Sequence, residues 1–285
     1  MNKKTNVILT HPDKILYPEN KITKKMLYEY YDNIQELILP YITNRPLTIV
    51  RCPENYKSCF YQKHLQHPLL GLHTFPIKEK LKTDEYFFIE DVVGLFELVQ
   101  IGCLELHPWG SMINHVEHPD MIIFDLDPAP DVSWKKVVAA AFEIKNFLHK
   151  MKLKSFVKTT GGKGLHVVVP ISPKYSWDEI KNFAHDIVNQ MVLENPRDYI
   201  NTMSKIKRKG KVFLDYLRNG RGATAIAPYS TRARLHAPIA TPIHWDELTN
   251  NIRDNFFTLK TIPAHLKHRK ADPWKNFLKL TQQLI

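Results

Sequence analysis

The chain has 285 residues, with 40 Lys and Arg against 29 Asp and Glu, which gives a formal net charge of +11. Hydrophobic residues make up 44% and charged residues 24%, a composition typical of folded globular proteins that excludes a disordered chain. The basic excess favours a polyanionic partner, because cations that neutralise phosphates release condensed counterions. A basic surface that is merely solvated is the alternative that charge alone leaves open.

Cysteine usage and apolar runs argue against secreted and membrane-spanning classes. Cys52, Cys59 and Cys103 form neither a C-x-x-C pair nor a disulfide framework, so we expect free thiols in a reducing compartment. The apolar run near the N-terminus is too short for a signal peptide, and the stretch 137–142 is too short to span a bilayer. We expect a soluble, cytoplasmic, nucleoid-associated protein with no membrane partner and, by default, a monomer.

The first half of the chain predicts one long helix and several short strands. Apolar residues at helical spacing follow Thr23 until Pro46 closes the region, which predicts a helix that begins at Thr23. Short strands or strand-loop junctions are expected at 48–52, 58–64 and 85–91. Segment 94–106 fits a helix or a buried strand pair, and we favour a helix.

The second half alternates strands with two long helices. Strands are predicted at 121–128, 155–160, 165–171, 211–217 and 223–229. A helix over 133–151 has Ser133 as its predicted N-cap, and a helix over 176–195 opens with a capping box made by Ser176 and Glu179. This alternation, with adjacent strand pairs, predicts an α/β (α+β) architecture.

Asp125 and Asp127 stand in the apolar strand MIIFDLDP. Because side chains on a strand alternate, both carboxylates share one face, while Ile122, Phe124 and Leu126 share the other. Two neighbouring carboxylates repel each other and are tolerated most easily around a divalent cation. A pair of exposed aspartates near a proline turn is the alternative.

The run from Thr159 to His166, TTGGKGLH, joins glycines to hydrogen-bond donors. Glycines let backbone N–H groups approach an anion closely, and two hydroxyls and Lys163 add donors. The run is not a P-loop, because a strand rather than a helix follows it. A tight hairpin with a solvated lysine explains the glycines but not the charge and the histidine together.

Asp215 is a third acid, inside the strand pattern KVFLDYL and surrounded by bases. Three carboxylates that hold two cations about 4 Å apart are what in-line phosphoryl transfer requires, and the bases would bind phosphates. The alternative is that Asp215 only pairs with these bases, which are Lys205, Lys207, Arg208, Lys209, Lys211, Arg218 and Arg221.

Taken together, FDLDP, GGKGLHVVVP and KVFLDYLRNGRGATAIAPYS resemble the polymerase domain of bacterial DNA ligase D, in the archaeo-eukaryotic primase superfamily. Matching segments extend over nearly the whole chain: HPDKILYP, TKKMLYEYY, RCPE, CFYQKH, LELHPWGS and TPIHWDEL. The resemblance implies a primase-polymerase fold, with a central antiparallel or mixed sheet that is RRM-like in its catalytic part and flanked by helices. We expect a stand-alone polymerase unit with one domain over 1–285. An N-terminal subregion (about 1–118) would carry 5′-phosphate and template contacts, and a catalytic subregion would cover 119–285.

The resemblance also implies roles for single residues at the reaction centre. Asp125, Asp127 and Asp215 match the catalytic acids that hold two Mn²⁺ or Mg²⁺ ions. The matched nucleotide contacts are Thr160, Lys163, His166 and Arg232 for the triphosphate and His107 beside the sugar. Position 160 is usually Ser in the family, so Thr is a mild departure.

Matches in the first half imply contacts to DNA. Lys14 and Lys24 match a pair that binds the 5′-phosphate on the downstream side of a gap or break. Phe60 and Tyr61 match a pair, usually Phe-Phe, that contacts the template, and Tyr keeps the stacking face but adds a hydroxyl. Lys63 and His64 lie beside this pair and could touch the DNA backbone.

The implied function is a nucleotidyltransferase that fills gaps or extends 3′ ends at DNA breaks, preferring NTPs to dNTPs. Its pathway would be non-homologous end joining, with Ku and a DNA ligase as partners. A primer-making or excision-repair polymerase is an alternative within the family. A two-metal nuclease would not need the triphosphate-binding residues, and a DNA-end or RNA binding module would not need three intact acids.

Overall fold

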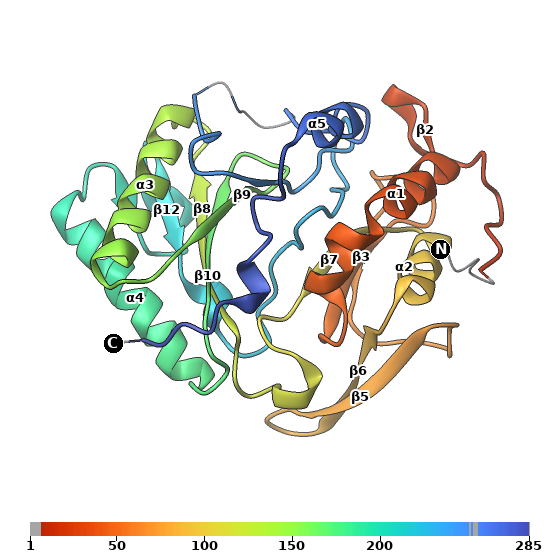
Figure 1. Cartoon of the computed structure of the whole chain (residues 1–285), viewed down its shortest axis with the longest axis horizontal. Helices are drawn as coiled ribbons and strands as arrows, with labels where there is room; N and C mark the ends of the chain where they lie inside the picture. Colours follow the sequence, from red (N-terminus) through yellow and green to blue (C-terminus); the bar gives the residue numbers. More distant parts are fainter. Residues whose placement is uncertain (1–6, 251, 253–255, 285) are drawn as a thin grey trace.

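The structure is a computed structural model that describes residues 7–250, 252 and 256–284. Its largest sheet has the strand order β11-β12-β8-β10-β9-β13 (Figure 1). The strands are β8 (Met121–Pro128), β9 (Phe156–Thr159), β10 (Leu165–Pro170), β11 (Tyr199–Ile200), β12 (Val212–Asp215) and β13 (Pro242–Ile243). All neighbours pair antiparallel except β11 and β12, which are parallel. The predicted α/β (α+β) class with a central antiparallel or mixed sheet is therefore confirmed.

Two helices, α3 (Trp134–Lys150) and α4 (Trp177–Glu194), cover one face of this sheet (Figure 1). The buried stripe of α3 follows the helical repeat and consists of Val137, Ala140, Ala141, Ile144 and Leu148. On β8 the alternate residues Ile122, Phe124 and Leu126 are all at most 1% exposed. Burial of this side of β8 under helices leaves Asp125 and Asp127 on the opposite face of the sheet.

The predicted helix starts are correct in position, but one predicted N-cap residue makes no capping hydrogen bond. Ser176 and Glu179 form the predicted capping box at the start of α4. Thr23 caps α1 (Lys24–Ile42) by accepting a hydrogen bond from the Met26 N–H at 3.3 Å. Ser133 has the extended backbone of an N-cap residue, but its side chain makes no capping hydrogen bond.

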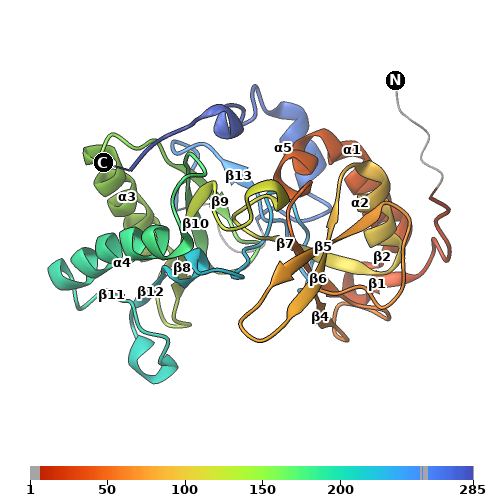
Figure 2. The same ribbon diagram turned by 90° about the horizontal axis from the view of Figure 1, so that it is seen from below.

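Smaller sheets and two helices form the other half of the molecule (Figures 1 and 2). A three-stranded sheet has the order β4-β3-β7, with β3 (Leu47–Arg51), β4 (Phe60–Gln62) and β7 (Cys103–Pro108). The other elements are the ribbon of β5 (Leu72–Lys78) and β6 (Thr83–Ile89), the pair β1 (Ile15–Tyr17) and β2 (Ile22–Thr23), α2 (Val92–Gln100), and α5 (Ile262–His268) near the C-terminus. Helix α1 packs on α2 and β7, which buries the apolar side of this half.

Two predicted elements differ from the structure. Segment 94–106 is neither a single helix nor a strand pair, because the backbone turns at Gly102 (φ +84°) between α2 and β7. Segment 223–229 is not a strand in the structure. Pro228 lacks an N–H donor and Tyr229 has a positive φ of 65°, so the segment cannot pair along its length. It instead crosses between the sheets, where Ala227 N–H donates to the Leu106 carbonyl at 2.8 Å.

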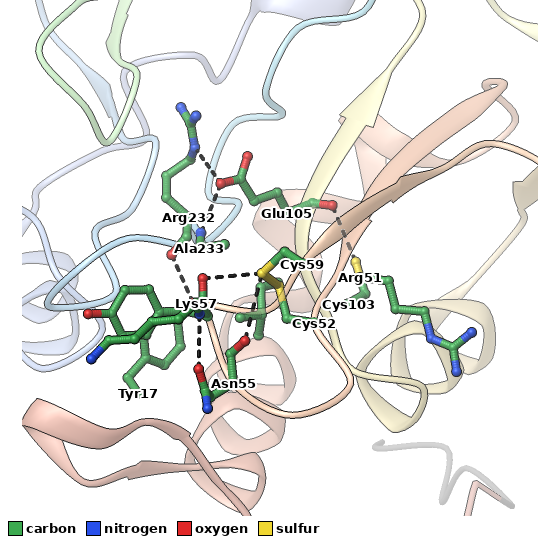
Figure 3. Close-up of a disulfide and its surroundings, with 12 residues drawn as sticks. Tyr17, Arg51, Cys52, Asn55, Lys57, Cys59, Cys103, Glu105, Arg232 and Ala233 are labelled. Atoms are coloured by element: carbon green, nitrogen blue, oxygen red, sulfur yellow. Dashed lines mark hydrogen bonds and ion pairs between the residues drawn. A yellow bond between two sulfur atoms is a disulfide. The ribbon is translucent and has the colours of Figure 1, made fainter.

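The expectation of free thiols is wrong for two of the three cysteines. Cys52 and Cys59 form a disulfide, with Cα atoms 4.2 Å apart (Figure 3). The antiparallel pairing of β3 with β4 explains the bridge. Arg51 lies opposite Phe60, so Cys52, which follows Arg51, is adjacent to Cys59, which precedes Phe60. Cys103 is free and buried. The inference of a reducing compartment loses its basis, since it depended on free thiols.

We expect this disulfide to stabilise the fold by about 2 kcal/mol, the value that chain entropy predicts for so short a loop. Reduction of the wild-type protein should lower its urea midpoint, whereas a Cys52→Ala/Cys59→Ala variant should have the lower midpoint with or without reductant. Cys103→Ala, which leaves the bridge intact, is the control. A wild-type midpoint that does not change on complete reduction would contradict the prediction.

Three tyrosines of the N-terminal half bind the backbone of residues 229–232. Tyr17 donates its hydroxyl to the Arg232 carbonyl at 2.8 Å, and Tyr30 donates to the Tyr229 carbonyl at 2.7 Å. The Tyr31 hydroxyl accepts from the Thr231 N–H at 3.2 Å and lies 3.0 Å from the Thr231 hydroxyl. All three tyrosines are at most 5% exposed, so these hydrogen bonds fix the position of a segment that is distant in sequence.

Within the described part of the chain, no helix has both the length and the apolarity needed to cross a membrane. The first six residues, part of the stretch in which the sequence predicts no signal peptide, lie outside the described residues.

Candidate active site

The three predicted acids come together on the face of the sheet opposite α3 and α4. In the antiparallel pair of β8 with β12, Asp215 lies directly opposite Asp125, and Phe213 lies opposite Asp127. Directly opposed residues on a sheet have their side chains on the same face, so the carboxylates of Asp125 and Asp215 are neighbours. The sequence placed these acids on two separate strands, and the pairing register brings them together.

Arginines neutralise the carboxylates. Arg218 Nε lies 3.2 Å from an oxygen of Asp125 and 3.4 Å from one of Asp215. Arg208 Nη1 lies 3.5 Å from Asp127, and it comes from the basic segment between β11 and β12, which projects beyond the sheet (Figure 2). The acid cluster is therefore balanced by cations from two different segments.

The pKa values follow this arrangement. Burial alone would raise the pKa of Asp125, but the charges and hydrogen bonds of His166 and Arg218 lower it well below its ordinary value. Burial and the charge of Asp125 raise the pKa values of Asp127 and Asp215. Asp125 thus repels both Asp127 and Asp215, as expected for a site that binds positive charge.

The donor chemistry of this cluster fits a divalent cation, because carboxylate oxygens are the ligands that Mg²⁺ and Mn²⁺ prefer. Asp125 and Asp215 already share one positive group, the guanidinium of Arg218. Among the described residues, no three donors converge on a single point. Ion binding between these two acids therefore requires the Arg218 side chain to move aside.

A glycine-rich hairpin between β9 and β10 forms the next wall of the site. Gly161 has a φ of +65°, and a Cβ on Gly164 would lie 2.5 Å from the Leu126 carbonyl oxygen on β8. Only glycine permits the first conformation at low cost and the second approach at all. Thr160 is buried and its hydroxyl donates to the Gly164 carbonyl at 3.1 Å, whereas Lys163 is exposed.

An open pocket of about 420 Å³ lies between the acids and this hairpin. Its lining is mostly polar and basic, as expected for a pocket that takes an anionic ligand. The lining residues include Tyr61, His107, Asp125, Asp127, Thr160, Lys163, His166, Arg218, Arg232 and Arg234. Asp215 does not line the pocket and is 8% exposed.

Glu105 does not line the pocket but contacts two residues that do, His107 and Arg232. Its carboxylate accepts from His107 Nε2 at 2.8 Å. It also accepts from the Ala233 N–H at 2.8 Å and lies 3.0 Å from Arg232 Nε (Figure 3). Burial alone would raise the pKa of Glu105, but the hydrogen bonds from His107 and Ala233 and the charges of Arg232 and His107 together lower it to about 2, from an ordinary value of 4.5. Glu105 is 4% exposed, so a buried carboxylate holds both side chains.

We expect Glu105 to make stability depend on acid pH. Because its pKa is lower in the folded state, its contribution is fully present above about pH 4.5 and is lost as the pH falls toward 2. Glu105→Gln should lower the free energy of unfolding by about 3 kcal/mol at pH 7, with the difference shrinking below pH 4.5. Urea unfolding of both proteins at pH 7, 5, 4 and 3 measures this, and a difference that stays constant over the series would contradict it.

A buried lysine lies behind the pocket. Lys158 on β9 is 2% exposed and is directly opposite His166 on β10. Its ammonium has no hydrogen-bond partner among the described residues, and burial, with the charge of Arg232, lowers its pKa to about 7. Burial and the charge of Lys158 lower the pKa of His166 to about 4, so His166 is neutral near pH 7.

The structure places the two candidate 5′-phosphate residues close together, away from the pocket. Lys24 is 5% exposed, and its amine donates to the Thr10 carbonyl and to Gln100, each at 2.9 Å. The Lys14 amine donates to the Pro53 carbonyl. Burial and the nearby charge of Lys14 lower the pKa of Lys24, so two cations share this site.

The candidate template residues are exposed and lie on or just after β4. Phe60 is 46% exposed and Tyr61 is 74% exposed, and the Tyr61 ring lies 6.3 Å from the ring of His107. Lys63 and His64 instead contact β6. The Lys63 amine donates to the Tyr86 hydroxyl at 3.2 Å, and His64 Nδ1 lies 2.8 Å from the Glu85 carbonyl.

Sequence reasoning missed Glu105, Arg234 and Lys158, and treated Arg218 only as one base among many. Glu105 is two residues before His107, so strand alternation places both on one face, and this signal could have identified it. Arg234 lies close to the hairpin, since a Cβ on Gly162 would be 2.8 Å from its Nη1. Nothing in the sequence distinguishes Lys158 from a surface lysine.

Acids on paired strands, beside a pocket lined by cations and a glycine-rich hairpin, define a site of the nucleotidyltransferase class. Comparison with known proteins identifies the family. The family described as LigD, primase-polymerase domain, matches residues 23–274. The chain belongs to this family of nucleotidyltransferases.

Similar proteins cover nearly the whole chain. The multifunctional non-homologous end joining protein LigD of Pseudomonas aeruginosa is 31% identical over 281 residues, which are 98% of this chain and 34% of that protein. The Mycolicibacterium smegmatis protein of the same name is 34% identical over 254 residues, covering 88% of this chain and 33% of that protein. The chain thus spans about a third of these relatives.

A solved structure is similar over the same extent. The polymerase domain from Mycobacterium tuberculosis ligase D in complex with DNA superposes with a TM-score of 0.89 at 27% identity. The match covers 98% of this chain and 100% of that domain. The resemblance stated from the sequence is therefore confirmed, and so is the primase-polymerase fold.

Proposed function

We propose that this chain extends the 3′ end of DNA at a gap or double-strand break, preferring NTPs to dNTPs, in non-homologous end joining. The observation that carries the proposal is the pocket, which is lined by the acids Asp125 and Asp127 and also by cations, namely Lys163, Arg232 and Arg234. An incoming nucleotide needs both, because its triphosphate is held by cations while its reacting phosphorus lies near the acids.

We propose that Asp125 and Asp127 hold two ions, Mn²⁺ or Mg²⁺, and that Asp215 completes the site where the primer 3′-hydroxyl attacks. Such ions would stabilise the developing negative charge and lower the pKa of the attacking hydroxyl. The protein itself orients the nucleotide. Thr160, Lys163, His166 and Arg232 would bind the triphosphate, and His107 would lie beside the sugar.

We also propose that Lys14 and Lys24 bind a 5′-phosphate on the downstream strand. Burial and the charge of Lys14 lower the pKa of Lys24, and the charge of Glu97 offsets this only in part, so a phosphate that accepts from both lysines would be favourable. Exposed Phe60 and Tyr61 would stack on template bases, with Lys63 and His64 near the backbone. In this division, residues of about 1–118 mainly contact DNA and 119–285 carry the chemistry.

The partners proposed are broken or gapped DNA of the nucleoid, NTPs and dNTPs, Ku, and a DNA ligase. Support comes from relatives named for non-homologous end joining and from a similar domain solved with DNA. The net charge of +11 favours binding through phosphates, and such binding should weaken steeply as salt rises.

Primer extension across a one- or two-nucleotide gap in Mn²⁺ tests the proposal. Substrates with and without the 5′-phosphate are compared, each with NTPs and with dNTPs, and the Asp125→Ala/Asp127→Ala protein is the control. We expect incorporation that needs the acids, favours NTPs and improves with the 5′-phosphate. Incorporation that ignores the phosphate would favour priming or excision repair, and no incorporation with DNA still bound would refute polymerase activity.

A further inference from the structure

Glu105 connects two parts of the pocket that would contact different parts of a nucleotide. One oxygen lies 3.0 Å from Arg232 Nε and accepts from the Ala233 N–H at 2.8 Å. The other oxygen accepts from His107 Nε2 at 2.8 Å. Glu105 itself does not line the pocket, whereas His107 and Arg232 do. Its carboxylate thus acts on a ligand only through these two side chains.

We propose that Glu105 is a positioning residue, which fixes the hydrogen-bonding state of His107 and the orientation of Arg232 and thereby sets sugar selection and triphosphate affinity together. The inference rests on the proposed function, because it assigns nucleotide contacts to His107 and Arg232.

The carboxylate partner of His107 determines which ring nitrogen carries the proton. An ionised carboxylate can only accept, so His107 Nε2 must carry the proton and donate it. In the neutral ring the other nitrogen, Nδ1, is then an acceptor. A ring held in this form offers an acceptor to the 2′-hydroxyl of ribose. A 2′-deoxyribose lacks that hydroxyl.

Several contacts hold Arg232 in place. Its Nη1 donates to the Thr160 carbonyl at 2.7 Å, and its own carbonyl accepts from Tyr17 at 2.8 Å. Glu105 adds an ion pair, with its carboxylate 3.0 Å from Nε, although Nε itself makes no hydrogen bond within the described residues. One hydrogen bond and one ion pair thus hold the guanidinium. A guanidinium held in this way loses less freedom when it binds a phosphate.

Replacing one carboxylate oxygen of Glu105 by an NH₂ group disturbs its contact either with His107 or with the Arg232 and Ala233 side. The amide of Glu105→Gln has one acceptor oxygen and one NH₂ donor, so it cannot accept from His107 on one side and from the Ala233 N–H on the other, and it lacks the charge that pairs with Arg232. We expect the KM for an NTP to rise about tenfold, the usual scale for loss of a partner that orients a binding group. We expect a smaller rise for the dNTP, and therefore a several-fold loss of the NTP over dNTP preference, with kcat changed less than KM.

The experiment measures KM and kcat for ATP and dATP on a gapped substrate, and binding of each nucleotide by calorimetry in Mn²⁺ without DNA. Glu36→Gln, the same change at an exposed position of α1, is the matched control, and Glu105→Asp should restore part of the affinity. Thermal melts confirm that each variant is folded at the assay temperature.

A double variant separates positioning from general damage. If Glu105 acts on the sugar through His107, then Glu105→Gln/His107→Ala should have the same NTP to dNTP ratio as His107→Ala alone. Equal nucleotide affinities and ratios for wild type and Glu105→Gln would overturn the inference. A wild-type protein that incorporates no nucleotide would refute the proposed polymerase function, and the calorimetric comparison would still decide the role of Glu105.

Discussion

Asp125→Asn should reduce nucleotide incorporation at least about a thousandfold, which corresponds to about 4 kcal/mol of transition-state stabilisation. Asp125 is central in the cluster, since it lies 3.4 Å from His166 and 3.2 Å from Arg218, and it faces Asp215 across the strand pair. The amide keeps the shape of the side chain but removes the negative charge that would bind a cation.

Single-turnover primer extension with saturating nucleotide measures this loss directly. Asp186→Asn, a change of the same kind at an exposed site on α4, should leave the rate unchanged. DNA binding measured in parallel should be nearly the same for both variants, because Asp125 is not among the residues proposed to contact DNA. A rate for Asp125→Asn within tenfold of wild type would refute the assignment of Asp125 as a catalytic acid.

Arg45→Met should lower the free energy of unfolding by about 3 to 5 kcal/mol, the range for removing one partner of a buried ion pair. Arg45 is 1% exposed and binds Asp120 with both ends of its guanidinium, at 2.8 and 2.6 Å. It lies between α1 and β3, and Asp120 immediately precedes β8, so the pair joins the two halves of the molecule. Without Arg45, the Asp120 carboxylate has lost its main partner.

Urea unfolding of three variants tests this account. Lys25→Met breaks an exposed pair with Glu29 and should change stability very little. The double variant Arg45→Met/Asp120→Leu should recover much of the loss, because neither charge then remains buried alone. Equal stabilities for Arg45→Met and Lys25→Met would show that the buried pair does not hold the halves together.

Elements with a strong local pattern were predictable from the sequence. The strand at Asp125, the glycine hairpin and the capping box at Ser176 all follow from periodicity or turn chemistry, which act within a few residues. Strand β5 was not predicted, because it contains Pro76 and proline weakens any strand prediction. The apolar run that ends at Tyr229 looked like a strand, but its burial comes from crossing between sheets.

Contacts that depend on how strands pair or on distant segments were not predictable from spacing. The disulfide of Cys52 and Cys59 depends on the register of β3 with β4, and the contact of Glu105 with Arg232 joins residues from separate regions of the chain. The position of Asp215 opposite Asp125 has the same origin. Resemblance to the family supplied the identities of the pocket residues, whereas their partners became visible only in three dimensions.

The tyrosine hydrogen bonds to residues 229–232 have a consequence for biosynthesis. The hydroxyls of Tyr17, Tyr30 and Tyr31 are buried against acceptors that the ribosome adds some two hundred residues later. Until then the nascent N-terminal half lacks those acceptors, and buried hydroxyls without partners are unfavourable. We therefore expect that half to become protease-resistant only late in translation, once the chain has passed Arg232 and this segment has left the exit tunnel.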